Sequence, residues 1–97
     1  MNTDKRLIDA MIAEFKKHTG IEKVVLFGSR ARGDNTERSD YDIAIYGSLT
    51  RDEVSNLRLT FDEDLPTLHK IDLIFMQDKL STQFRNSIET EGLKIYG

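Results

Sequence analysis

The chain of 97 residues contains no cysteine, and no uninterrupted apolar run is longer than Val24 to Phe27. Without cysteine the protein forms no disulfides and has no thiolate ligands for a metal, which fits a reducing compartment. The apolar runs are far too short for a membrane-spanning helix. Residues 1–6 also lack the apolar core of a secretion signal. We therefore expect a cytoplasmic protein without a membrane span.

A basic excess is also missing, because 14 lysines and arginines stand against 17 aspartates and glutamates, a formal net charge of −3. Binding to a nucleic-acid backbone needs clustered positive charge, so we expect no direct contact with nucleic acid. The apolar fraction of 38% and charged fraction of 32% are typical of a soluble folded protein. A chain of this length predicts one domain, residues 1–97, with a modest core.

Apolar spacing predicts a first helix over residues 4–18, with Thr3 placed to cap its start and Gly20 to end it. A second helix is predicted over residues 51–62. It follows the sequence Thr50-Arg51-Asp52-Glu53, which has the form of a capping box. Both helices carry apolar side chains at spacings of three and four and are therefore expected to pack on a core.

Three short segments predict strands. Residues 23–27 are apolar after Lys23 and include two β-branched valines, and residues 71–75 are apolar apart from Asp72. Residues 41–46 alternate, so Ile43 and Ile45 are expected on one face and Asp42 on the other. A charged residue within an otherwise apolar strand requires a chemical or hydrogen-bonding reason.

The C-terminal part predicts one more helix and an extended tail. Leu80, Phe84 and Ile88 recur at helical spacing, and Gly92 is expected to end that helix. Residues 93–96 are then expected to pack back on the core in extended form.

The acidic residues of the predicted strands indicate a metal site. Asp40 and Asp42 share one strand face about 6.6 Å apart, close enough to converge on two cations about 3.5 to 4 Å apart. Asp72 would add a third carboxylate, and without a cation such a cluster raises carboxyl pKa values and destabilises the fold. Oxygen ligands alone favour Mg²⁺, and Mn²⁺ could substitute for it.

A glycine–serine turn follows the strand at residues 23–27. Gly28 lets the backbone approach a ligand closely, and the amide and hydroxyl of Ser29 can donate to phosphate oxygens. The spacing is not that of a Walker loop, and Gly-Ser alone is a weak signal. We interpret the turn as a phosphate cradle because of the aspartates that follow it.

Together these residues resemble a known signature. Gly28-Ser29, ten intervening residues and then Asp40-x-Asp42 is similar to the motif of DNA-polymerase-β-type nucleotidyltransferases, specifically their minimal (MNT) group. Asp72 is similar to the third carboxylate of that family. The resemblance covers nearly the whole chain. It implies an α/β (α+β) nucleotidyltransferase domain in which a mixed sheet of three to four strands is flanked by helices.

The resemblance also implies an activity. ATP and two Mg²⁺ ions would be bound, and AMP would pass to a hydroxyl with release of diphosphate. Asp40, Asp42 and Asp72 would be the catalytic metal ligands, and Gly28 and Ser29 would bind the nucleotide. Members of this size resemble MntA-like antitoxins, which place AMP on a tyrosine of a helical HEPN-type ribonuclease toxin and so silence it.

Two other functions stay open. The chain could be an antibiotic-type transferase acting on a small hydroxylated molecule, although it is too short to leave sequence for an acceptor pocket. It could instead block a toxin by contact alone, although a pure binder gains nothing from clustered carboxylates. Arg30, Arg32 and Arg38 could neutralise phosphate or the acidic cluster or form surface ion pairs, and we leave them outside the site. His18 and His69 lack partners at catalytic or metal spacing and are interpreted as structural.

Overall fold

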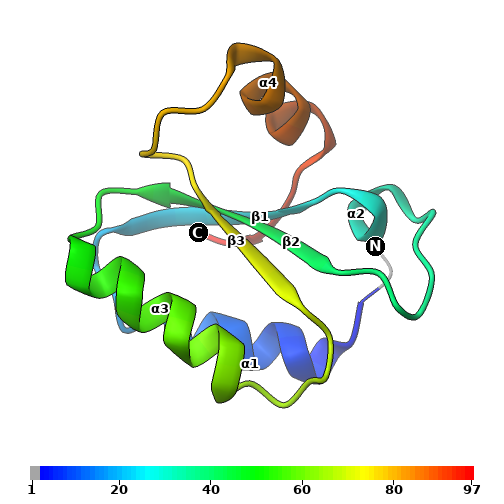
Figure 1. Ribbon diagram of the computed structural model, residues 1–97, viewed down its shortest axis with the longest axis horizontal. Coiled ribbons are helices and arrows are strands. Elements are labelled where there is room, and N and C mark those ends of the chain that lie inside the picture. The colour runs from blue at the N-terminus through cyan, green and yellow to red at the C-terminus, as the bar shows by residue number, and fades with distance from the viewer. Residues whose placement is uncertain (1–2) are drawn as a thin grey trace.

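The computed structural model describes residues 3–97 and shows a four-stranded sheet with helices on both faces (Figure 1). The strand order is β3-β2-β1-β4, with β2 and β3 parallel and the other neighbours antiparallel. This mixed sheet confirms the predicted fold class. Residues 1 and 2 of the expected domain lie outside the described part. The elements are α1 (Lys5–Phe15), β1 (Ile21–Phe27), α2 (Ser29–Arg32), β2 (Tyr41–Gly47), α3 (Arg51–Glu63), β3 (Ile71–Phe75), α4 (Thr82–Glu91) and β4 (Leu93–Tyr96).

The first helix is shorter than predicted at its C-terminal end. Its N-cap is Asp4 and not Thr3, because the Asp4 side chain accepts a hydrogen bond from the Arg6 amide at 2.9 Å. After Phe15 the chain tightens into a turn, in which the His18 amide donates to the Phe15 carbonyl at 3.1 Å. The first strand therefore begins at Ile21, two residues earlier than the apolar run indicated.

The other elements follow the predictions closely. The capping box of Thr50 and Glu53 is present at the start of α3, and β3 has its predicted bounds. The last helix begins after Ser81, which caps it, so Leu80 precedes the helix. The predicted tail is a true strand, since β4 pairs antiparallel with β1.

The sheet separates two apolar clusters. Most of the core lies between the sheet and the helices α1 and α3, below the sheet in Figure 1. Ile43 and Ile45 belong to this larger cluster, whereas Ala44 faces the smaller one under α4, as alternation along a strand requires. Among residues 3–97 no helix combines the length and the apolar character needed to cross a membrane. The smaller cluster consists of Val25, Phe27, Ala44, Met76 and Ile88.

Candidate active site

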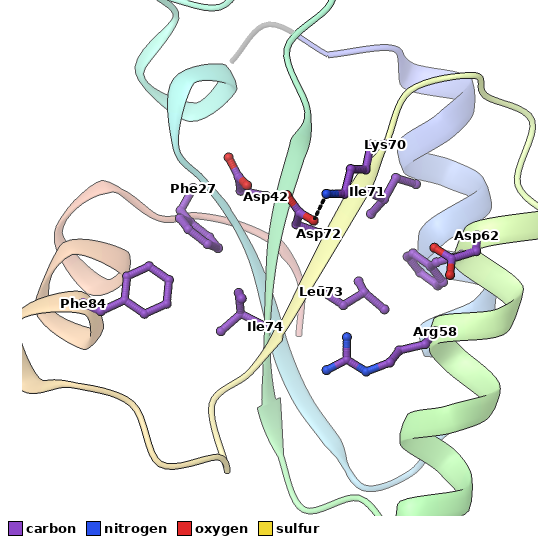
Figure 2. Close-up of a pocket in the computed structure, with 11 residues that line it drawn as sticks. Phe27, Asp42, Arg58, Asp62, Lys70, Ile71, Asp72, Leu73, Ile74 and Phe84 are labelled. Atoms are coloured by element: carbon purple, nitrogen blue, oxygen red, sulfur yellow. Dashed lines mark ion pairs between the residues drawn. The ribbon is translucent and has the colours of Figure 1, made fainter.

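The pairing of β2 with β3 places two of the predicted aspartates side by side. Asp42 and Asp72 are partners in the parallel register, so both side chains emerge on the α4 face of the sheet (Figure 2). Asp40 lies just before β2, which begins at Tyr41. Its predicted place within the strand is therefore wrong by one residue, although it stays close to the pair.

The three predicted carboxylates influence one another electrostatically. Burial raises the pKa of the Asp42 carboxyl above its usual range, and the negative charges of Asp72 and then Asp40 raise it further. The guanidinium of Arg32 acts in the opposite direction, and Glu91 adds a small contribution of the same sign as the aspartates. Asp42 is thus the centre of an acidic cluster in which the charged form is disfavoured.

The donor chemistry of this cluster suits a hard divalent cation. Its carboxylate oxygens are the ligands that Mg²⁺ prefers, and a cation would remove the repulsion that raises the Asp42 pKa. As they stand in residues 3–97, however, no three acidic, histidine or cysteine side chains are gathered closely enough to hold a metal ion. Lys70 approaches Asp72 instead, with Nζ and Oδ1 3.4 Å apart. That pair is largely exposed and therefore weak.

The glycine–serine turn lies directly beside Asp42. Gly28 has a φ of 75°, a conformation that favours glycine, and a Cβ there would come 2.3 Å from Oδ2 of Asp42. A side chain at this position would strain the backbone and collide with the acidic cluster. Ser29 opens the short helix α2, which ends at Arg32. Glycine is therefore required at position 28 by the closeness of Asp42 as much as by any ligand.

Arg30 has a role that sequence reasoning missed. It is only 5% exposed and is the one charged side chain that is buried among the described residues. Its Nε donates to the Ser39 carbonyl at 3.1 Å, and Nη2 donates to the Glu37 carbonyl at 3.3 Å. The guanidinium also lies 4.1 Å from the centre of the Tyr41 ring. Arg30 therefore holds the loop that delivers Asp40 and Asp42, and the interpretation as a surface residue is wrong.

Arg32 and the two histidines behave as interpreted, whereas Arg38 is exposed and has no ion pair among residues 3–97. Arg32 is an exposed ion-pairing residue that contacts Asp34 and Glu91. His18 follows α1 and contacts Glu53, with His18 Nδ1 and a carboxylate oxygen 3.0 Å apart. His69 packs edge-on against Tyr41 at the entry to β3.

An open groove of about 610 Å³ extends from Asp42 and Asp72 across β3. Arg58 and Asp62 of α3 line one side of β3, and Phe27 with Phe84 of α4 line the other, as Figure 2 shows. The domain thus has a groove beside the acidic cluster, at the place where two helices flank one strand from opposite faces. The expectation that the chain has no acceptor pocket of its own stays a prediction.

Comparison with known proteins agrees with this geometry. A family model described as "Polymerase beta, Nucleotidyltransferase" matches residues 9–97. The chain belongs to this nucleotidyltransferase family. A protein of Methanocaldococcus jannaschii named "Putative protein adenylyltransferase MJ0604" is 34% identical over 101 residues, covering 99% of this chain and 100% of the relative. The resemblance noted from the Gly28-Ser29 turn and the aspartates is thus confirmed, and the protein is a nucleotidyltransferase.

Solved structures share the fold. A toxin-antitoxin structure with AMP-PNP superposes with a TM-score of 0.71 at 23% identity, covering 93% of this nucleotidyltransferase and 73% of that chain. A structure of a tri-AMPylated Shewanella oneidensis HEPN toxin in complex with an MNT antitoxin gives a TM-score of 0.63 at 21% identity, covering 93% and 69%. At such identities the likeness establishes the architecture alone.

Proposed function

We propose that this nucleotidyltransferase transfers AMP from ATP to a hydroxyl of a protein, a tyrosine of a HEPN-type ribonuclease toxin, and acts as its antitoxin. The name of the relative from M. jannaschii and the toxin-antitoxin complexes with the same fold support this proposal. The observation that carries it is the register of Asp42 with Asp72 beside the Gly28 turn. Since such a toxin acts on RNA inside the cell, we propose a cytoplasmic location, with residues 1–97 as the catalytic domain.

Each predicted residue has a role in this reaction. Asp40, Asp42 and Asp72 would hold two Mg²⁺ ions, or Mn²⁺, which when bound stabilise negative charge on the attacking and leaving oxygens. Gly28 leaves room for the phosphates, and Ser29 would donate hydrogen bonds to the leaving diphosphate. The acceptor oxygen attacks the α-phosphorus of ATP, the bond to the β-phosphate breaks, and Asp72 favours loss of the acceptor proton.

We expect the order of the strands to separate the two substrates. The Gly28-Ser29 turn follows β1, Asp42 lies on the central β2, and Asp72 lies on the edge strand β3. The triphosphate would therefore lie toward β1, and the acceptor hydroxyl would approach from the side of β3. Asp42 stands between them, in a position to influence both.

The decisive experiment is the intact mass of the helical toxin after co-expression with this protein. We expect AMP increments with the wild type and with the control Asp9→Asn, whose side chain lies on the exposed face of α1. We expect none with Asp42→Asn. Increments that persist in Asp42→Asn would contradict the assigned site. No increments with any form, together with silencing of the toxin, would indicate inhibition by contact alone.

One observation supports the alternative of a small-molecule acceptor. The volume of the groove lies in the range of sites that bind drug-sized molecules. AMP transfer to a hydroxylated antibiotic, with no transfer to a protein, would establish this alternative.

A further inference from the structure

We propose that the acceptor reaches this site as an extended polypeptide segment that pairs with the free edge of β3. This inference rests on the proposed function, because it describes how a protein hydroxyl is presented. Within residues 3–97 the sheet order is β3-β2-β1-β4, so β3 has a neighbour on one side only.

The hydrogen-bond pattern identifies the backbone groups on that edge. The Tyr41 amide donates to the Lys70 carbonyl at 3.0 Å, and the Met76 amide donates to the Ile45 carbonyl at 2.9 Å. Every second residue of a strand directs its N–H and C=O groups toward the same neighbouring strand. The even-numbered residues of β3 therefore bond to β2. Ile71 and Leu73 therefore direct their N–H and C=O groups outward, on either side of Asp72.

The two edges of the sheet differ in how well they are protected against pairing with a further strand. On the β4 edge the pairing with β1 is interrupted by a register shift between Val24 and Val25, and Lys94 lies within the short strand. Such features discourage further pairing. Residues Ile71–Phe75 have five partners in β2 in unbroken register and contain neither lysine nor proline. This edge is thus suited to accept another strand.

The groove provides walls for the side chains of such a strand. It extends along both faces of the β3 edge, with α3 on one side and Phe84 on the other. Successive side chains of a paired segment would alternate between these two faces. The lining carries both signs of charge, Arg58 and Lys70 against Asp62 and Asp72. A side chain directed to the α4 face beside Asp72 would lie next to the acidic cluster, since neighbouring strands place such side chains about 5 Å apart.

A second copy of the chain fits this edge less well than an acceptor segment. Pairing of β3 with β3 about a two-fold axis would bring the acidic groups around Asp42 and Asp72 of both copies together. Like charges would then face each other across the interface. An acceptor segment introduces no such repulsion.

Two nine-residue peptides with a central tyrosine test the pairing. One alternates threonine and valine around the tyrosine and favours an extended form, and the other is built from alanine, glutamate and lysine and does not. With ¹⁵N-labelled protein, Mg²⁺ and a non-hydrolysable ATP analogue, we expect the extended peptide to slow hydrogen exchange at the Ile71 and Leu73 amides. It should also accept AMP with a kcat/KM about ten-fold or more above that of the other peptide, as expected for one or two additional hydrogen bonds.

A variant of the edge provides the matched test. Ile71→Pro removes one outward N–H at the first strand residue, where proline is tolerated, and Ile71→Val retains it. We expect the proline variant to lose about ten-fold in kcat/KM for the extended peptide while ATP binding is unchanged, and the valine variant to stay within about two-fold. If the proline variant does not fold, the exchange measurement on the wild type still decides.

Equal use of both peptides, or unchanged exchange at Ile71 and Leu73, would overturn the pairing. Protection of these amides by protein concentration alone would show that a second copy occupies the edge. AMP transfer from ATP to the intact toxin, with release of diphosphate and dependence on Asp42, serves as the independent measure of the enzyme. If that transfer persists while the peptides are not distinguished, this inference fails and the proposed function stands. If it is absent, the proposed function fails.

Discussion

At the scale of single residues, a change at Asp42 is expected to have the most effects. Its carboxyl is crowded by Asp72 and Asp40, and a Cβ on Gly28 would touch it. A binding cation would relieve a repulsion that the folded chain otherwise tolerates. We therefore expect Asp42 to affect both stability and cation binding.

We predict that Mg²⁺ with a non-hydrolysable ATP analogue raises the Tm of the wild type and that EDTA abolishes the increase. Asp42→Asn should show no such increase, because the cation loses a charged ligand, yet it should unfold at the same or a higher urea concentration without ligand. Thermal scans and urea titrations with Asp9→Asn as the control measure both effects. A ligand-induced Tm shift of wild-type size in Asp42→Asn would contradict the metal assignment.

Arg30 leads to a second prediction at this scale. Arg30→Lys retains the charge but cannot make the same hydrogen bonds to Ser39 and Glu37, and should cost about 1.5 to 3 kcal/mol of unfolding free energy. We expect kcat for AMP transfer to fall more than the KM for ATP rises, since the loop carrying Asp40 is displaced. Arg38→Lys, on the exposed part of the same loop, is the control. Wild-type kinetics in Arg30→Lys would show that the hydrogen bonds of Arg30 only stabilise the fold.

At the scale of elements, the start of α3 links two helices. The Glu53 carboxylate accepts a hydrogen bond from the Thr50 amide at 3.2 Å and contacts His18 beyond α1. Its capping box satisfies backbone donors that the helix leaves unpaired. Thr50→Ala should therefore cost about 1 kcal/mol, measured by urea unfolding at neutral pH.

The same capping box predicts a pH dependence. The hydrogen bond with His18, followed by that from Thr50, lowers the pKa of Glu53 below its usual 4.5. A carboxyl with a lowered folded-state pKa stabilises the fold above its unfolded pKa, and this contribution is lost as the pH falls through the folded value. Glu53→Gln should thus be less stable than the wild type at neutral pH and approach it below about pH 4. A difference that stays constant down to that pH would exclude ionisation as the cause.

At the scale of the whole molecule, the small cluster under α4 closes the second face of the sheet. Ile88 is fully buried there, and Phe84 of the same helix packs on Phe27 beside the groove. Ile88→Ala should cost about 2 to 5 kcal/mol by loss of buried methyl groups and the resulting cavity. Urea unfolding would measure this cost. Leu59→Ala, on the exposed side of α3, should change stability by less than about 0.5 kcal/mol.

Local patterns account for what was predictable. Apolar periodicity located the helices and strands because each has to bury one face, and the Gly28 turn with its following aspartates identified the candidate site. The unpredicted features depend on distant segments. Residues 93–96 became a strand because β1 offered an open edge to them. Arg30 is buried because a loop nine residues away folds over it.

By itself, the sequence determined which faces of the helices and strands are apolar and which residues are candidates for the chemistry, because both follow from side-chain type and spacing. Only the tertiary structure decided that Asp42 lies in register with Asp72, that β3 stands at an edge, and that a groove opens along it. The register of Asp42 with Asp72 joins segments thirty residues apart, and all three relations follow from the packing of the sheet against helices on both faces rather than from any local pattern.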